Sequence, residues 1–478
     1  MVRTRIAPSP TGFPHIGTVY QVLFDYAYAK QHGGTFICRI EDTDRVRFVE
    51  GSEQVIYDSL AWFGLLPDES PSVGGPFGPY RQSERLAIYK KYAEELLEKK
   101  HAYYCFCTKE RLEQLRGEQT KRKIPPMYDK HCLSLPKEEI DKKLKEHTPY
   151  VIRMDVPQNR KVVFDDMIVG KVAFESNVLD DQVLIKSDGF PTYHLAVVVD
   201  DHLMEITHIF RGKEWISSTP KHVLLYEFFG WKMPIHGHLP LILNSDGKGK
   251  LSKRHGHASV SFYKEKGFLP EAILNYLSNI VWNHPEGKEI YSLEEFITLL
   301  DITKITSAGA RFDLIKLEWL NGEYIRKTQM PKLKDQIVGY LKTYVIPAKA
   351  GIHIDPRSES GMTIVEKTVP LIQTRIKTFS EYWPMCEFFF KRPTSYEKEV
   401  NKEWIKKIIA EFEKLPEWNH DVLYAAGAKV AEELNVSKSK LFMDIRIAIT
   451  GKKIGPPLFE SMEVLGKEES LERLKNIL

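Results

Sequence analysis

The chain has 478 residues and a formal net charge of +3, with 68 lysines and arginines against 65 aspartates and glutamates. It is too long for one ordinary domain, so we expect roughly two to five modules. No apolar run reaches about eighteen residues, which argues against a membrane span, and the near-balanced charge requires any nucleic-acid surface to be local. Five cysteines are too few and too unevenly spaced for a disulfide scaffold, so the cytoplasm is the expected compartment.

The first eighteen residues predict a strand, a loop and the start of a helix. Residues 2–7 predict a buried strand, residues 8–12 a loop rich in Pro, Ser and Gly, and residues 20–31 an apolar helix. A helix N-terminus after a glycine-containing turn can bind an anion, because backbone N–H groups and the helix dipole point toward it. His15 could donate to a phosphate oxygen there, and Gly17 leaves room for a base or ribose. The alternative is an ordinary strand–helix junction with His15 facing solvent.

Carboxylates follow the second predicted strand. Residues 35–40 are rich in β-formers, and Glu41, Asp42 and Asp44 come directly after them. In an open α/β sheet, ligands bind beyond the carboxyl ends of the strands, so these carboxylates could hold a substrate ammonium group. Alternatively, Asp42 or Asp44 caps the next helix.

A change of pattern over residues 83–188 predicts an inserted domain, and the nucleotide-binding fold resumes after it. The apolar run 195–199 predicts a fully buried parallel strand. Residues 206–210 predict another strand, which ends on Arg211, and residues 239–243 predict a third.

A lysine-rich loop follows the third of these strands. Residues 244–249 are rich in Gly, Asp and Asn, and they lead into Lys250, Ser252, Lys253 and Arg254. Such a loop can close over pyrophosphate, and its cations can stabilise charge that develops in phosphoryl transfer. The alternative is a solvated run of lysine and arginine.

Beyond residue 260 the patterns are helical. Ser292 and Glu295 form a capping box, and residues 313–326 and 332–344 predict further helices. Residues 345–362 contain Pro, Gly and Ser and predict a surface loop with no role of its own. Helices rich in Lys and Glu follow from 397 to the last residue.

The motif around His15 and Gly17 together with the motif around Lys250 and Lys253 resembles the HIGH and KMSKS signatures of class I aminoacyl-tRNA synthetases. Residues 5–12 and 39–45 look like the glutamyl-tRNA synthetase branch of that class. The resemblance runs to the C-terminus, except at 345–362, where the family has a much shorter connection.

The resemblance implies an α/β nucleotide-binding, Rossmann-like catalytic domain with an α+β insertion, followed by an all-α C-terminal anticodon-binding region. Five parts are expected. They are the first half of the catalytic domain (1–82), an insertion that binds the tRNA acceptor end (83–188), the second catalytic half (189–244), a lysine-loop and stem-contact helical domain (245–327), and the anticodon-binding region (328–478).

The resemblance also implies which residues bind substrates. Glutamate is expected at Arg5, Ala7, Ser9, Glu41, Tyr193 and Arg211, with Arg5 and Tyr193 on its side-chain carboxylate, Arg211 on its α-carboxylate, and Glu41 with Ser9 facing its amino group. ATP is expected at His15, Gly17, Glu214, Trp215 and Lys253. The catalytic set is His15, Gly17, Lys250, Ser252 and Lys253. The structural alternative for the arginines is burial in pairs with Asp200 or Asp201.

A metal site is the next implication. Cys105, Cys107 and Cys132 look like three ligands of a structural zinc, and Tyr128 or His131 is the candidate fourth, with Tyr128 matching one family pattern better. The alternative is a set of free thiols at a strand end. In the helical half, Arg375 falls where some members carry an arginine that reads the last anticodon base.

The expected function is therefore ATP-dependent attachment of glutamate to tRNA(Glu) in two steps, with Mg²⁺ accompanying ATP and a monomeric, cytoplasmic enzyme. The alternative within the branch is a non-discriminating enzyme that also charges tRNA(Gln). A catalytically dead tRNA-binding protein would be expected to show damaged motifs, and a small-molecule ligase would have no use for the helical half.

Overall fold

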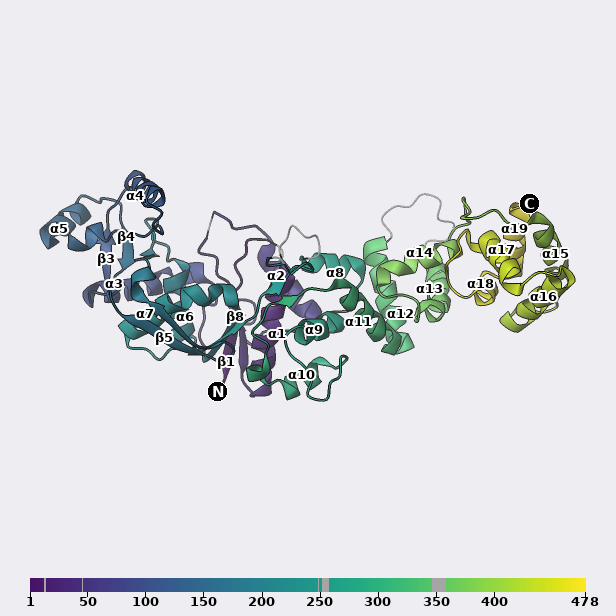
Figure 1. Ribbon diagram of the computed structural model, residues 1–478, viewed down its shortest axis with the longest axis horizontal. Coiled ribbons are helices and arrows are strands. Elements are labelled where there is room, and N and C mark those ends of the chain that lie inside the picture. The colour runs from purple at the N-terminus through teal and green to yellow at the C-terminus, as the bar shows by residue number, and fades with distance from the viewer. Residues whose placement is uncertain (13, 45, 248, 252–257, 346–357) are drawn as a thin grey trace. The chain divides into compact units, whose positions relative to one another are not determined.

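The structure is a computed structural model of the whole chain, and it describes all residues except 13, 45, 248, 252–257 and 346–357 (Figure 1). The chain divides into two compact units. The first comprises Met1–Val260 and Leu274–Asp313, and the second comprises Ser261–Ile273 and Leu314–Leu478. The finer five-part division remains a prediction. Among the described residues, no helix is both long and apolar enough to cross a membrane.

The first unit begins with a β–α–β element. Strand β1 (Arg3–Ile6) pairs in parallel with β2 (Thr35–Cys38), and α1 (Ile16–Gln31) connects them. Both predicted strands and the predicted helix are confirmed. The helix begins four residues earlier than its apolar pattern indicated, because His15 caps its N-terminus.

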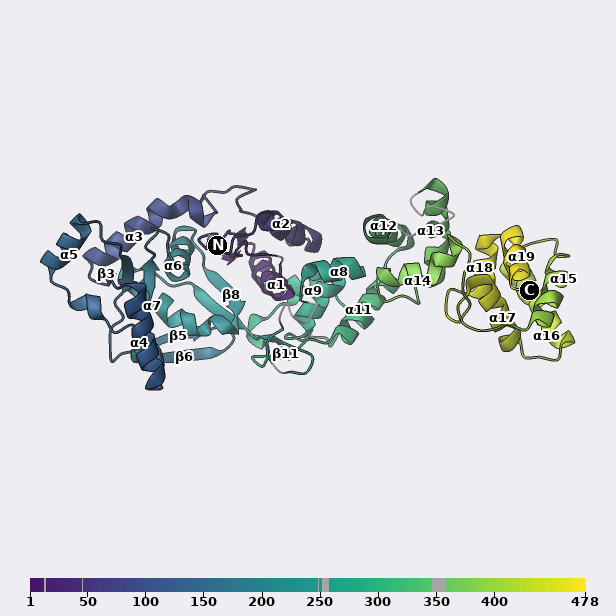
Figure 2. The same cartoon turned by 90° about the horizontal axis from the view of Figure 1, so that it is seen from above.

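A four-stranded sheet joins two strands of the inserted segment to two strands that follow it (Figures 1 and 2). Its strand order is β6-β5-β9-β8, with β5 and β6 antiparallel and β9 parallel to both β5 and β8. The strands are β5 (Lys161–Asp166), β6 (Gly170–Glu175), β8 (His208–Gly212) and β9 (Ile235–Leu239). Thr207, the residue before β8, donates its amide to the carbonyl of Arg3, the first residue of β1. Strands β8 and β1 therefore lie beside each other.

The predicted buried strand at 195–199 is wrong. These residues lie in helix α6 (Tyr193–Leu203), which packs against α3 (Leu86–Glu98) and α7 (Thr219–Phe229). All five apolar residues are buried, as the pattern indicated, but a short apolar run without periodicity does not distinguish a strand from a helix buried on all sides. Asp200 and Asp201 therefore lie in the last turn of a buried helix, and their side chains are 0% and 2% exposed.

The third predicted strand, at 239–243, is divided. Strand β9 ends at Leu239, and a short strand β10 (Ile242–Leu243) pairs with β11 (Ala310–Arg311). Pro240 lies between the two strands, and it has no N–H group to continue a ladder.

The inserted segment builds its own small sheet. Strands β3 (Ala102–Cys105), β4 (Val151–Met154) and β7 (Val183–Ile185) are antiparallel neighbours. The remaining helices of this unit are α2 (Ser52–Phe63), α4 (Lys109–Lys121), α5 (Lys137–Lys145) and α10 (Leu293–Leu299). The predicted helix start at Ser292 is confirmed, because the Glu295 amide donates to the side chain of Ser292, but the reciprocal half of the capping box is not formed, since the Glu295 side chain pairs with His284 and Lys288 instead.

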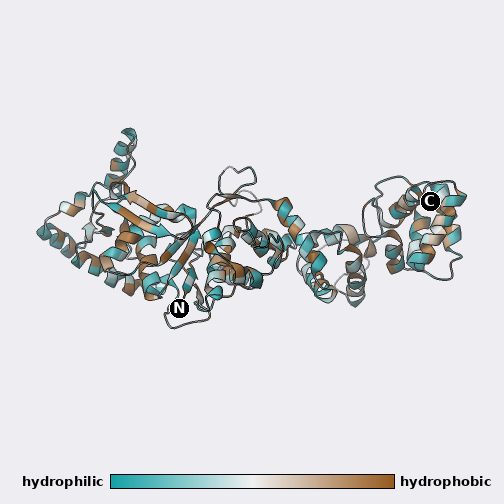
Figure 3. Ribbon diagram, turned by 60° about the horizontal axis from the view of Figure 1, so that its bottom comes forward, coloured by the Kyte–Doolittle hydropathy of each residue, from teal (hydrophilic) through white to brown (hydrophobic). Residues whose placement is uncertain are grey.

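The described part of the second unit is helical. Buried and exposed residues recur along its helices, so apolar stripes face two cores, and Figure 3 shows the corresponding bands of hydrophobic and hydrophilic residues. Its main helices are α8 (Val260–Lys266), α11 (Leu314–Lys327), α12 (Met330–Tyr340), α13 (Glu359–Ile372), α14 (Tyr382–Cys386), α15 (Lys402–Phe412), α16 (His420–Glu433), α17 (Lys438–Thr450), α18 (Leu458–Leu465) and α19 (Lys467–Asn476), and α9 (Pro270–Asn279) starts in it.

The surface loop predicted at 345–362 ends earlier than expected. Residues 346–357 lie outside the described part of the chain, but helix α13 already begins at Glu359. Ser358 is its N-cap, since the Ser358 side chain accepts a hydrogen bond from the Gly361 amide. The fold class predicted from the sequence, an α/β catalytic part with an insertion and an all-helical C-terminal part, is confirmed.

Candidate active site

Two adjoining cavities lie in the first unit, between the carboxyl end of β1 and the N-terminus of α1. Their volumes are about 350 and 490 Å³, and His15, Thr18, Gln21 and Trp215 line both. The first is lined by all six residues expected to bind glutamate: Arg5, Ala7, Ser9, Glu41, Tyr193 and Arg211. The second is lined by the described residues of the ATP and catalytic sets: His15, Gly17, Glu214, Trp215 and Lys250.

The turn that carries His15 is stabilised by its own side chain. His15 has extended backbone angles, and the Gly17 amide donates to His15 Nδ1 at 2.9 Å. Because Nδ1 accepts a hydrogen bond, the proton of the neutral imidazole belongs on Nε2, where it can be donated to an anion. A Cβ added at Gly17 would lie 3.0 Å from that same Nδ1, so a larger residue would push the imidazole away.

Arg5 is held by a buried carboxylate. Its Nε and Nη2 donate to the two oxygens of Asp201 at 3.1 Å each, and Arg39 Nη1 donates to the same carboxylate at 2.7 Å. Burial opposes charging of Asp201, but the two guanidinium groups hold its pKa below the ordinary value. Arg5 is therefore a buried arginine paired with Asp201, which is the structural alternative considered for it. Arg5 still lines the cavity, with the Nε–Nη2 edge of its guanidinium turned away from a ligand.

Arg211 differs from Arg5 because no carboxylate pairs with it in the described part of the chain. It is 3% exposed and lies near the carboxyl end of β8. Its three nitrogens donate to Tyr193 Oη, Thr219 Oγ1 and His238 Nε2, at 3.2, 2.7 and 3.1 Å. Desolvation by burial lowers the pKa of Arg211, which means that its positive charge lacks full compensation. Tyr193 thus contacts Arg211, although the resemblance grouped it with Arg5.

The carboxylates after β2 have separate roles. Glu41 is 7% exposed, accepts a hydrogen bond from Arg39 at 3.0 Å and borders the first cavity. Burial raises the pKa of Glu41, against the lowering effect of Arg39 and Arg5. Asp42 accepts from the Ser83 amide, and Asp44 pairs with exposed Arg47. The capping alternative is wrong for both aspartates, since the N-cap of the next helix is Gly51.

The wall of the second cavity comes from the turn after β8. Glu214 and Trp215 lie in the 3₁₀ helix Lys213–Ser218, and Lys250 pairs with Glu214. Trp215 is 39% exposed and lines both cavities, so its indole can present a flat apolar surface to a ligand. The expected catalytic residues Ser252 and Lys253, and Arg254 beside them, lie outside the described residues.

His194 and His222 lie beside Tyr193, which lines the first cavity. His222 is 2% exposed, and its Nε2 is 3.1 Å from His194 Nδ1. Burial first, and then the positive charge of Arg211, hold the pKa of His222 well below its usual value, with His194 and His236 adding to the effect. We therefore expect the His222 imidazole to be neutral at physiological pH.

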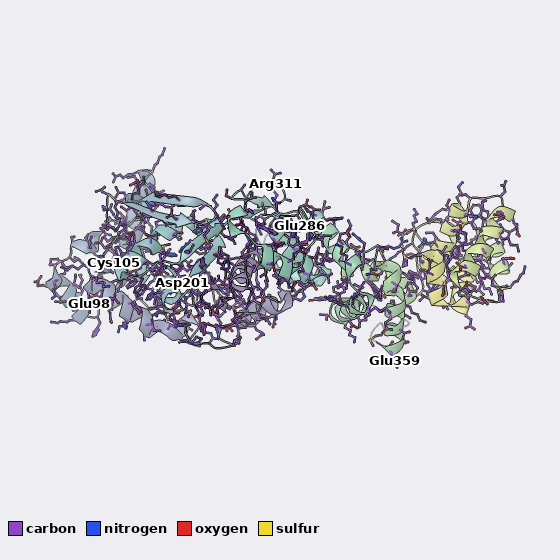
Figure 4. The ribbon with its side chains drawn as sticks, turned by 90° about the horizontal axis from the view of Figure 1, so that it is seen from below. Glu98, Cys105, Asp201, Glu286, Arg311 and Glu359 are labelled. Carbon is purple, nitrogen blue, oxygen red and sulfur yellow. The ribbon has the colours of Figure 1, made fainter. Side chains whose placement is uncertain are left out.

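Residues of the inserted segment form a cluster of thiols. The sulfur atoms of Cys105, Cys107 and Cys132 lie within 4.8 Å of one another, and Figure 4 marks Cys105 within the unit. Tyr128 Oη lies 3.4 and 3.3 Å from Cys105 and Cys107 and accepts from the Cys132 amide at 3.0 Å. His131 is exposed. Three thiols and one phenol that converge on one point suit a tetrahedral soft-metal site, so the geometry favours Tyr128 over His131 as the fourth ligand.

Arg375 follows α13 in the second unit. It is exposed, and its Nη1 donates to the Gly455 carbonyl at 3.4 Å. Burial and the nearby charge of Arg375 lower the pKa of Arg446, so two cations lie close together beside the turn at Gly455. The role of Arg375 in reading the anticodon remains a prediction.

Several residues of the site were not expected from the sequence: Arg39, Asp166, Thr219 and His238. Each acts through tertiary contacts, since Asp166 and His238 are 72 positions apart and Arg39 and Asp201 are 162 apart. The available signal was weak: His236 and His238 alternate in an otherwise apolar strand, and a buried strand rarely carries imidazoles without partners.

The family models agree with this architecture. The model described as "tRNA synthetases class I (E and Q), catalytic domain" matches residues 1–319, and the model described as "Anticodon binding domain" matches residues 336–478. The fold is thus that of a class I tRNA synthetase.

The curated relatives narrow the assignment. A glutamate–tRNA ligase of Fusobacterium nucleatum is 44% identical over 100% of this chain and 97% of its own length. One of Psychrobacter sp. is 45% identical over 99% of this chain and 92% of its own length. Among solved structures, a glutamate tRNA ligase from Elizabethkingia meningosepticum in complex with its amino acid is similar, with a TM-score of 0.88 and 37% identity over 100% of this chain and 99% of that one. The chain belongs to the glutamate–tRNA ligase family.

Proposed function

We propose that this protein attaches glutamate to tRNA(Glu) at the expense of ATP, releasing AMP and pyrophosphate. One observation carries the proposal beyond family membership. The residues expected for glutamate line one cavity, the described residues expected for ATP line a second, and His15 and Trp215 border both. Two reactants held in adjoining cavities can react without a further diffusional encounter.

The first step joins the two substrates. An oxygen of the glutamate α-carboxylate attacks the α-phosphorus of ATP, the bond to the bridging oxygen breaks, and pyrophosphate leaves. Arg211 orients the α-carboxylate, and the Nε2–H of His15 donates to the phosphate. Mg²⁺, which accompanies ATP in this class, would neutralise the polyphosphate, and Lys253 would stabilise charge on the leaving group.

The second step transfers the amino acid. The 2′-hydroxyl of the terminal adenosine of tRNA attacks the carbonyl carbon of glutamyl adenylate, and AMP leaves. We assign acceptor-end binding to the inserted segment and anticodon binding to the helical second unit, with Arg375 as a residue that reads the last anticodon base. A monomeric, cytoplasmic enzyme belongs to the same proposal.

Selection of glutamate over glutamine rests on positive charge in the first cavity. Arg211 orients the α-carboxylate, which glutamate and glutamine share, so the choice between them falls to Arg5 and Tyr193, which border the same cavity and would meet the side-chain carboxylate. A neutral amide in place of a carboxylate would lose a charge-assisted hydrogen bond, which contributes about 1.5–3 kcal/mol.

We further propose one structural zinc ion in the inserted segment. Cys105, Cys107, Cys132 and Tyr128 would hold it, and it would fix the strand end that carries the first two cysteines to the turn that carries the other two ligands. No catalytic step depends on this ion.

ATP–pyrophosphate exchange tests the proposed activity. With purified protein, tRNA, Mg²⁺ and labelled pyrophosphate, label should enter ATP when glutamate is supplied and far more slowly with glutamine or aspartate. The same assay without tRNA determines whether adenylate formation needs the nucleic acid. Exchange that is equal with glutamine would overturn the charge-based selection, and absence of exchange with glutamate under both conditions would overturn the activity.

A further inference from the structure

The guanidinium of Arg211 is held on all its nitrogens by neutral groups. Tyr193 and Thr219 each accept one hydrogen bond through a hydroxyl oxygen, and His238 accepts the third through Nε2. By contrast, Arg5, Arg39 and Arg85 are all buried beside carboxylates. Among the described arginines of this site, Arg211 is therefore the buried one whose charge remains available to an anionic ligand.

The acceptor state of His238 is imposed by Asp166. The imidazole is fully buried on β9, and its Nδ1 lies 2.6 Å from Asp166 Oδ2 at the end of β5. Asp166 Oδ1 accepts hydrogen bonds from the amides of Ile168 and Val169 at 3.0 Å each, and the amide of His238 is shared by Oδ1 and Oδ2 at 3.1 Å from each. Three amide donors around the two oxygens keep the carboxylate ionised, so the short contact to Oδ2 requires a proton on His238 Nδ1.

The proton on Nδ1 determines what His238 offers to Arg211. A neutral imidazole with its proton on Nδ1 has a lone pair on Nε2, directed at the Nε–H of Arg211. Burial lowers the pKa of His238, which agrees with a neutral ring. The chain Asp166–His238–Arg211 thus aligns the guanidinium through a hydrogen bond and leaves its charge uncompensated by direct contact with a carboxylate.

We propose that Asp166 and His238 are positioning residues that orient Arg211 for the carboxylate of the amino-acid substrate. The inference rests on the proposed function, which gives Arg211 that ligand. It also assigns a substrate-positioning task to Asp166, a residue of the segment inserted between the two halves of the catalytic fold, whose strand β5 pairs with β9 at His236. A carboxylate in the place of His238 would hold the arginine equally well but would neutralise it.

The substitution Asp166→Asn tests the inference with little change in shape. Because the amides of Ile168 and Val169 donate to Oδ1 alone, the asparagine carbonyl takes that place, and its NH₂ group then faces His238 Nδ1. The imidazole must accept there and carry its proton on Nε2, where it opposes the Nε–H of Arg211. We expect KM for glutamate in pyrophosphate exchange to rise about 10- to 100-fold while KM for ATP stays within about twofold. Asp165→Asn, at the exposed neighbouring position of the same strand, is the matched control and should change neither.

A second variant separates positioning from general damage. In a His238→Gln background no tautomer remains to be reversed, because a glutamine carbonyl can accept from Arg211 whatever residue lies at 166. Asp166→Asn should therefore raise KM for glutamate at least fivefold less in that background than in the native one. Equal effects in the two backgrounds would overturn the positioning role.

Nitrogen-15 histidine spectra provide a readout that does not depend on activity. The resonance that disappears in His238→Gln belongs to His238, and it should show a protonated Nδ1 in the native protein and a protonated Nε2 in Asp166→Asn. The native protein with the proton on Nε2 would contradict the proposal, even if the variant had lost its activity or stability.

Arg211→Gln distinguishes failure of this inference from failure of the proposed function. If Arg211→Gln leaves KM for glutamate unchanged, the assigned ligand of Arg211 is wrong. If Arg211→Gln raises that KM and Asp166→Asn does not, the function stands and the positioning role is wrong.

Discussion

Replacement of Asp201 by asparagine should destabilise the first unit strongly. Its carboxylate accepts from Arg5 at 3.1 Å and from Arg39 at 2.7 Å, and these side chains are 3% and 0% exposed. Removing one partner of a buried ion pair costs about 3–5 kcal/mol, because the other charge is left without compensation in a poorly solvated site. Arg39 keeps Glu41 and Asp200 as partners, so most of the cost should arise at Arg5.

Hydrogen exchange measures this loss in the unit that contains Asp201. Exchange of amides in β1 and β2 should become about 150- to 4,000-fold faster in Asp201→Asn if these strands exchange through global opening of the unit. Asp44→Asn is the control, since the pair of Asp44 with Arg47 is 39% and 74% exposed and should contribute at most about 1 kcal/mol. Equal protection in the two variants would refute the view that the Asp201 pairs stabilise this site.

Four further outcomes are expected. Lys253→Ala should slow adenylate formation about 10²- to 10³-fold in pyrophosphate exchange, with tRNA binding retained, and a near-native rate would remove the lysine loop from the mechanism. Elemental analysis should find close to one zinc per chain, lost in the double variant Cys105→Ser/Cys107→Ser, and zinc-free protein from zinc-replete medium would reject the site. Because burial lowers the pKa of His222, the unfolded chain binds a proton more readily than the folded one. The neutral, buried state of His222 therefore costs no free energy of unfolding above the unfolded pKa of about 6.5, and the protein loses stability as the pH falls below that value. In His222→Gln, the slope of unfolding free energy against pH should be smaller below pH 6.5, by up to about 1.4 kcal/mol per pH unit. An unchanged slope in urea titrations would contradict this. Arg375→Ala should weaken discrimination between tRNAs that differ in the last anticodon base, and unchanged charging ratios would reject that assignment.

The sequence was sufficient for elements whose signals are local. The strand–loop–helix at the N-terminus, the helix cap at Ser292 and the helical C-terminal part were all predicted, since periodicity and capping residues are read within one turn or one strand. Helix α6 was mistaken for a strand at 195–199 because a helix buried on all sides has no polar face to reveal its period.

Expected site residues were brought together, but their partners could not be predicted. That Arg5 binds Asp201 while Arg211 binds His238 depends on which strands and helices are neighbours in the fold, at separations of 196 and 27 residues. Motifs select residue types for contact with substrate, whereas the second layer of contacts follows from tertiary packing. The distinction between a compensated arginine and an uncompensated one therefore came only from the structure.

Charging of purified tRNAs with labelled amino acids tests the central claim most directly. With ATP and Mg²⁺, the protein should esterify glutamate to tRNA(Glu) until nearly all acceptor ends are occupied, and it should not esterify glutamine to any tRNA. Glutamate attached equally well to tRNA(Gln) would retain the ligase activity and show the non-discriminating form. No glutamate on tRNA(Glu), with the tRNA shown to be chargeable by another enzyme, would contradict the account.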